Sequence, residues 1–66
     1  MASDLNTELN LADPDGFYER LVGLHAGLTE EQSRLLNAKL ILLLANHIGD
    51  EAVLQAAMTA ARRGIA

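Results

Sequence analysis

The residues best suited to chemistry lie together at the end of an apolar segment, in the stretch Asn46-His47-Ile48-Gly49-Asp50. Imidazole, carboxylate and amide groups can bind metals, transfer protons or hold a polar ligand. A functional interpretation groups Asn46, His47, Asp50 and His25 around one turn. With Tyr18, these residues are the candidate contacts for a small ligand or a partner protein.

Metal binding and catalysis are not favoured by the spacing of these residues. Gly49 interrupts the helix between His47 and Asp50, so the two side chains do not form an i, i+3 ligand pair on one helix face. Neither Ser33 nor Thr59 has a base at a helical spacing that would activate its hydroxyl. A glycine-rich phosphate loop is also missing, and so small a core cannot enclose an ordinary substrate. We therefore expect a protein that is not an enzyme, with no catalytic residue, metal site or cofactor.

Two interpretations of the turn stay open. Asp50 follows Gly49 at the N-cap position of a helix, where a carboxylate commonly accepts backbone N–H groups. His47 lies in the last turn of the preceding helix, where the helix dipole stabilises an imidazolium and a backbone carbonyl can accept a hydrogen bond from its ring N–H. The turn is therefore either a binding surface or a purely structural connection.

Three helices must position these side chains, and local signals mark where each helix begins. Asp13 followed by Pro14 is a typical start, because proline is tolerated at the first helical position. Thr29 and Gln32 have the spacing of a capping box, and Asp50 is the third N-cap. Short connections predict consecutive helical hairpins in an all-α fold. The predicted elements are an irregular N-terminal arm over 1–12 and a three-helix domain over 13–66, with helices at about 14–27, 30–48 and 51–63.

The central helix has more apolar surface than the rest of one chain can cover. Six apolar residues follow one another from Leu40 to Ala45. The apolar arc of this helix spans roughly 220°, whereas a surface helix needs little more than about 100°. The flanking helices are short and rich in alanine, so a second copy is expected to cover the excess. The predicted interface of the homo-oligomer, most simply a dimer, is Leu36, Asn37, Leu40, Ile41, Leu43, Leu44 and Ile48.

Composition limits the other possibilities. The 66 residues allow one domain, and the sequence contains no cysteine that could stabilise it through a disulfide. The net charge of −4 disfavours nucleic acid as a partner. The N-terminus lacks the pattern of a signal peptide, and the apolar run is shorter than the roughly 20 residues that cross a bilayer. We expect a cytoplasmic protein with no membrane partner.

Several short motifs resemble one family. They are Asp13-Pro14-Asp15 with Phe17-Tyr18, then His25, Gly27-Leu28, Leu36-Asn37-Ala38, and Leu43-Leu44-Ala45-Asn46-His47-Ile48-Gly49-Asp50. Over roughly residues 10–60 the chain resembles short bacterial proteins grouped as domain of unknown function 2783. The resemblance implies a gene neighbourhood of flavin-dependent oxygenases and other enzymes of aromatic breakdown. It therefore implies an accessory subunit that binds such a larger enzyme.

These observations favour an interaction protein that self-associates through the helix at 30–48 and docks on a larger metabolic enzyme. The alternative is a small-ligand or metal-binding module that uses the turn at 46–50.

Overall fold

The structure, a computed structural model, describes residues 5–65 and has an all-α fold. Its helices are α1 (Pro14–Leu24), α2 (Glu30–Ile48) and α3 (Glu51–Arg62). No strand occurs in the part of the chain that is described. The predicted fold class is therefore confirmed. Residues 5–12 of the predicted arm carry no helix, and residues 1–4 of that arm lie outside the described residues.

Helix α1 begins where the sequence predicts. The Asp13 carboxylate accepts the backbone N–H of Gly16 over 3.1 Å, and Pro14 occupies the first helical position. A Cβ atom at position 16 would collide with the Asp13 carboxylate. Glycine at this position therefore leaves the space that the cap requires.

The predicted capping box starts α2. The Gln32 N–H donates to Thr29 Oγ1 over 3.1 Å, and the Thr29 N–H donates to Gln32 Oε1 over 3.0 Å. At the other end, Gly49 has a φ of +67° and closes the helix through its N–H to the Ala45 carbonyl. Only glycine adopts this left-handed conformation without strain, so α2 ends where the sequence predicts.

Helix α1 ends at Leu24, three residues before its predicted end. The N–H groups of His25 and Ala26 donate to carbonyls three residues back, those of Val22 and Gly23, each over 3.1 Å. This spacing tightens the last turn and stops the α-helical ladder. Gly27, with a φ of +80°, then reverses the chain. Helix α3 ends one residue before its predicted end.

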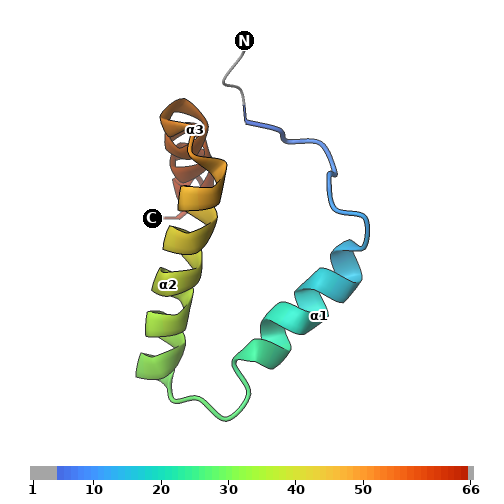
Figure 1. Cartoon of the computed structure of the whole chain (residues 1–66), viewed down its shortest axis with the longest axis vertical. Helices are drawn as coiled ribbons and strands as arrows, with labels where there is room; N and C mark the ends of the chain where they lie inside the picture. The colour runs from blue at the N-terminus through green and yellow to red at the C-terminus, as the bar shows by residue number, and fades with distance from the viewer. Residues whose placement is uncertain (1–4, 66) are drawn as a thin grey trace.

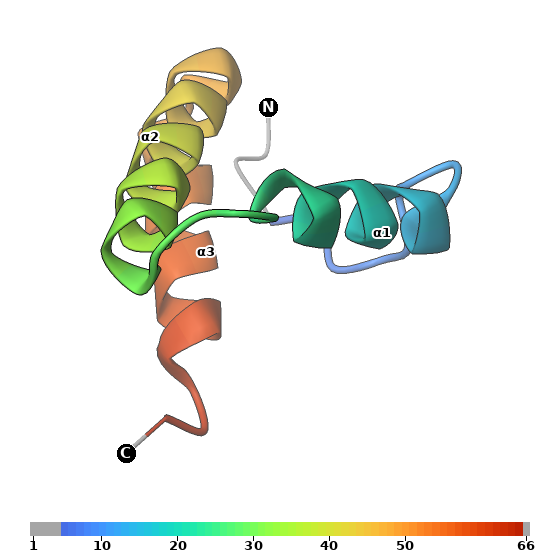
Figure 2. The same cartoon turned by 90° about the horizontal axis from the view of Figure 1, so that it is seen from below.

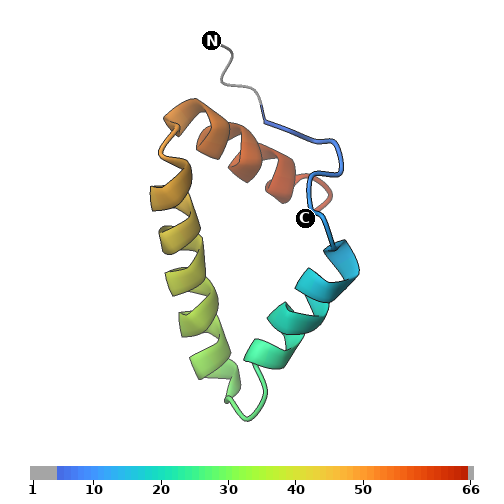
Figure 3. The ribbon, with the colours of Figure 1, turned by 45° about the vertical axis from the view of Figure 1, so that its right-hand side comes forward.

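The helices form an open triangle rather than a closed bundle (Figures 1 and 3). Seen from below, α1 extends to one side of α2 and α3 (Figure 2). Within residues 5–65, no two helices pack along their lengths, and no side chain is fully buried. The radius of gyration is 13.8 Å, whereas a compact domain of this length has about 11 Å. Residues 5–65 of a single chain therefore do not enclose a core.

Half-buried side chains occur on each of the three helices. On α2, Ser33, Leu36 and Leu40 recur at the spacing of one helix face, and Ala45 is half-buried on another side. Helix α3 likewise turns its small and branched residues to one side. The half-buried residues of the helices and their turns include Leu21, His25, Ser33, Leu36, Leu40, Val53, Leu54, Ala56 and Ala57.

The N-cap of α3 leads to a prediction about stability. Asp50 Oδ1 accepts the N–H groups of Ala52 and Val53 over 3.0 and 3.2 Å. Asp50→Ala removes both bonds and should lower the free energy of unfolding by about 1 kcal/mol. Asp50→Ser should keep most of the stability, because serine also caps well. Urea unfolding followed by circular dichroism at one protein concentration tests this; equal losses in both variants would contradict a capping role.

Candidate functional site

Helix α2 exposes most of its apolar side chains. Leu42 and Leu43 are 70% and 69% exposed, although both lie in the middle of the longest helix. Exposed leucines scattered over a surface are ordinary, but a contiguous apolar surface marks an interaction site. The exposed large apolar residues of α2 are Leu35, Ile41, Leu42, Leu43, Leu44 and Ile48.

These residues belong to two different faces of α2. Successive residues are about 100° apart around a helix, so Leu42 lies roughly 160° from Leu40. We define the inner face as Leu36, Leu40, Leu43 and Leu44, which includes the half-buried leucines. We define the outer face as Leu35, Ala38, Leu42 and Ala45, which follow one another at helical spacing. Lys39 and Asn46 form a narrow polar strip beside the outer face.

The predicted interface is divided between covered and uncovered positions. Leu36 and Leu40 are half-buried by the chain itself. The other predicted interface residues, Asn37, Ile41, Leu43, Leu44 and Ile48, are exposed. The apolar surface that a partner could cover is therefore only partly the surface predicted from the sequence.

Leu35 and Leu42 belong to the exposed apolar surface but were not among the predicted interface residues. They lie next to Lys39 and Asn46 around the helix, so the sequence pattern placed them at the border of the polar strip. A signal for Leu42 was present in the unbroken run from Leu40 to Ala45. Such a run covers every side of a helix, because it is longer than one turn.

The polar residues of the turn at 46–50 are held by the helix ends. Asn46 and His47 are exposed, and Asp50 is half-buried. Asp50 uses its carboxylate to cap α3, so its predicted capping role is confirmed. A contact of Asn46 or His47 with a partner remains a prediction.

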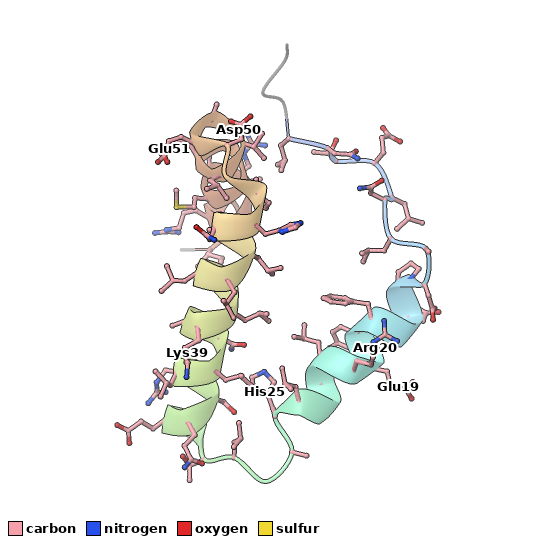
Figure 4. All side chains as sticks on the ribbon, in the orientation of Figure 1. Glu19, Arg20, His25, Lys39, Asp50 and Glu51 are labelled. Carbon is pink, nitrogen blue, oxygen red and sulfur yellow. The ribbon has the colours of Figure 1, made fainter. Side chains whose placement is uncertain are left out.

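His25 does not join this turn, so the predicted grouping is wrong. Its Nδ1 lies 2.9 Å from Ser33 Oγ, in the first turns of α2. Thirteen residues of helix separate Ser33 from Asn46, a rise of about 20 Å. Figure 4 shows His25 and Asp50 at opposite ends of α2. The physical reason is the connection at 25–29, which places the end of α1 beside the start of α2.

The hydrogen bond between His25 and Ser33 was missed because it joins two helices. The pattern within one helix predicts no base for Ser33, whereas the fold brings the imidazole of His25, the residue that follows α1, to its hydroxyl. The available signal was the short connection, which brings the end of one helix close to the start of the next. In residues 5–65 no three histidine, aspartate or glutamate side chains cluster so as to hold a metal ion. We interpret the half-buried pair as a link between α1 and α2.

Tyr18 is 66% exposed on α1 and therefore lies apart from the turn at 46–50. A shallow depression surrounds it, with carboxylates at its edge. The residues lining this depression are Asp13, Asp15, Gly16, Tyr18, Glu19 and Val22. Each of the two aspartates also lies at the start of α1, where the helix dipole stabilises negative charge.

The His25–Ser33 link leads to a prediction about α1. Ser33→Ala removes the hydrogen bond, whose net contribution should be about 1 kcal/mol. Because little else joins α1 to α2, amide hydrogen exchange should become faster in α1 and change little in α3. Thr59→Ala, which removes an exposed hydroxyl from α3, is the matched control. Unchanged exchange in α1 would show that the link contributes nothing.

Comparison with known proteins identifies a family without adding an activity. The family described as "Protein of unknown function (DUF2783)" matches residues 5–63. Neither the curated proteins nor the solved structures provide a match. Among the described residues, no helix has both the length and the apolar character needed to cross a membrane.

Proposed function

Because the chain belongs to the DUF2783 family, whose description assigns no activity, we propose a function mainly from the surface of the chain. The protein is a small bacterial interaction protein of the cytoplasm, without catalytic activity. It self-associates through α2, and the resulting homodimer serves as an accessory subunit of a larger metabolic enzyme.

The observation that carries this proposal is the amount of surface that one chain leaves in contact with water. Its accessible area is 5900 Å², whereas a folded monomer of this mass exposes about 4,100 Å². The excess is about 1,800 Å², to which the extended arm contributes. Obligate dimers bury about 1,000–2,500 Å² on each subunit. The excess area of one chain therefore falls within the range that each subunit of an obligate dimer buries.

The apolar character of the exposed surface of α2 supports self-association, as the excess area does. The exposed apolar residues of α2 are contiguous, and a helix with so wide an apolar arc is stable only when other elements cover most of it. Neither α1 nor α3 packs along α2. Small obligate oligomers often have no stable monomer, so folding and self-association should be coupled here.

A dimer formed through α2 leaves most of α1 free for a larger partner. Tyr18 and Val22 are exposed on α1 and stand beside carboxylates. We place the contact with the larger enzyme at this surface, and the family resemblance favours an enzyme of aromatic breakdown such as a flavin-dependent oxygenase. The turn with Asn46 and His47 is the second candidate contact.

The alternative function, binding of a small ligand or metal at 46–50, has less support. The carboxylate of Asp50 already accepts two backbone N–H groups. His25, the second histidine, hydrogen-bonds Ser33 near the far end of α2. The residues that such a site would combine are therefore separated or already occupied.

The proposal predicts the effect of one charge on the outer face. Leu42→Asp should reduce the mass in solution from that of a dimer toward 7.1 kDa, with loss of helical signal. In an isolated chain this exposed position would tolerate the change, because surface substitutions usually alter stability by no more than about 0.5 kcal/mol. Light scattering and circular dichroism at micromolar concentration measure the two effects.

Gln55→Asp is the control, because it adds the same charge at an exposed position of α3. This variant should keep the dimer mass. A parent protein that is monomeric, or a Leu42→Asp variant that remains a dimer, would contradict the proposed role of this face.

A further inference from the structure

We propose that the second copy pairs with α2 in antiparallel orientation, through the outer face formed by Leu35, Ala38, Leu42 and Ala45. This inference rests on the proposed self-association and specifies its geometry. The paired helices are related by a two-fold axis near residue 40. The contact of the homodimer thus does not include Leu36 and Leu40, which are half-buried within one chain.

The spacing of the outer face is that of a helix–helix contact. Its residues are separated by three, four and three positions, which is the a/d repeat of paired helices. Leu35, Ala38 and Leu42 are exposed and Ala45 is half-buried, so a partner can reach both leucines without moving any other element. Ala38 and Ala45 have small side chains, so the backbones of the two paired helices can approach closely.

The alternation of large and small residues favours the antiparallel direction. With the axis near residue 40, Leu35 lies opposite Ala45 of the partner subunit, and Leu42 lies opposite Ala38 of the partner subunit. Each leucine then fills the space beside an alanine, as close packing requires. In a parallel pair, leucine would face leucine and alanine would face alanine, so the alanine layers would leave gaps.

Charge favours the same direction. The first turn of α2 contains Glu30 and Glu31, and its last turn contains His47. Antiparallel pairing places the acidic start of one helix beside the end of the other, and it also opposes the two helix dipoles. Parallel pairing would instead bring Arg34 of each chain toward Lys39 of its partner, with repulsion between like charges.

Cross-linking can measure the direction, because the sequence contains no cysteine. Lys39 and Asn46 are exposed and lie on the same strip beside the outer face, two turns apart. In the antiparallel dimer, the two residues at position 39 lie across the axis from each other. Those at position 46 are offset by about 18 Å along the helices.

The experiment compares Lys39→Cys with Asn46→Cys, each treated as the full-length dimer with a bis-maleimide of two-carbon spacer. Circular dichroism and light scattering first establish that both variants are folded dimers. Lys39→Cys should give at least about ten times more linked dimer, because the short linker cannot span the offset at position 46.

Every other outcome of the cross-linking experiment refutes a specific part of the proposal. Equal linking of both variants means a parallel pair, which refutes the direction and leaves self-association intact. No linking in either dimeric variant means that another face is used, which refutes the outer face. A monomeric parent protein refutes the proposed function as well as this inference.

A packing exchange gives a second, independent measurement. Ala38→Leu should weaken an antiparallel dimer, because the new side chain meets Leu42 of the partner subunit. Adding Leu42→Ala to that variant should restore much of the dimer, since the large and small residues have exchanged places across the axis. In a parallel dimer Ala38→Leu would fill a gap and strengthen association, and that result in dilution light scattering would refute the proposal.

Discussion

One segment of α2, from Leu40 to Ala45, is apolar on every side of the helix and must be shielded from water. A helix of this kind is stable when neighbours surround it, and the chain offers few neighbours. Helix α1 meets α2 only near its first turns, and α3 diverges from its end (Figure 3). Within one chain Leu36 and Leu40 are only half-buried. The exposure of Leu35 and Leu42 on the outer face follows from this shortage of neighbours.

The helices are nevertheless well defined, because their ends depend on local bonds rather than on a core. Asp13, Thr29 with Gln32, and Asp50 each satisfy backbone N–H groups at a helix start. Each cap contributes about 1 kcal/mol, which is far less than the cost of ordering a chain of this length. Caps therefore decide where the helices begin, while apolar burial must supply the stability.

The charge of the chain has a similarly local explanation. Acidic residues lie in the first turns of all three helices, at Asp15, at Glu30 and Glu31, and at Glu51, where the helix dipole favours them. With the capping carboxylates of Asp13 and Asp50 included, most of the acidic residues thus have a structural role that requires no ligand. The surface that lacks such an explanation is apolar, which is why the proposed function concerns association with proteins rather than chemistry.

The sequence by itself determined the three helix starts, the end of α2 at Gly49 and the excess of apolar surface. These features depend on residues a few positions apart or on the composition of one helix. Only the tertiary structure decided that His25 meets Ser33 and lies far from Asp50. It also decided that Leu36 and Leu40 are half-buried while Leu35 and Leu42 stay exposed. The reason is that these relations depend on the angles between helices, which the turns at 25–29 and 49–50 set and which no periodic pattern within a single helix records.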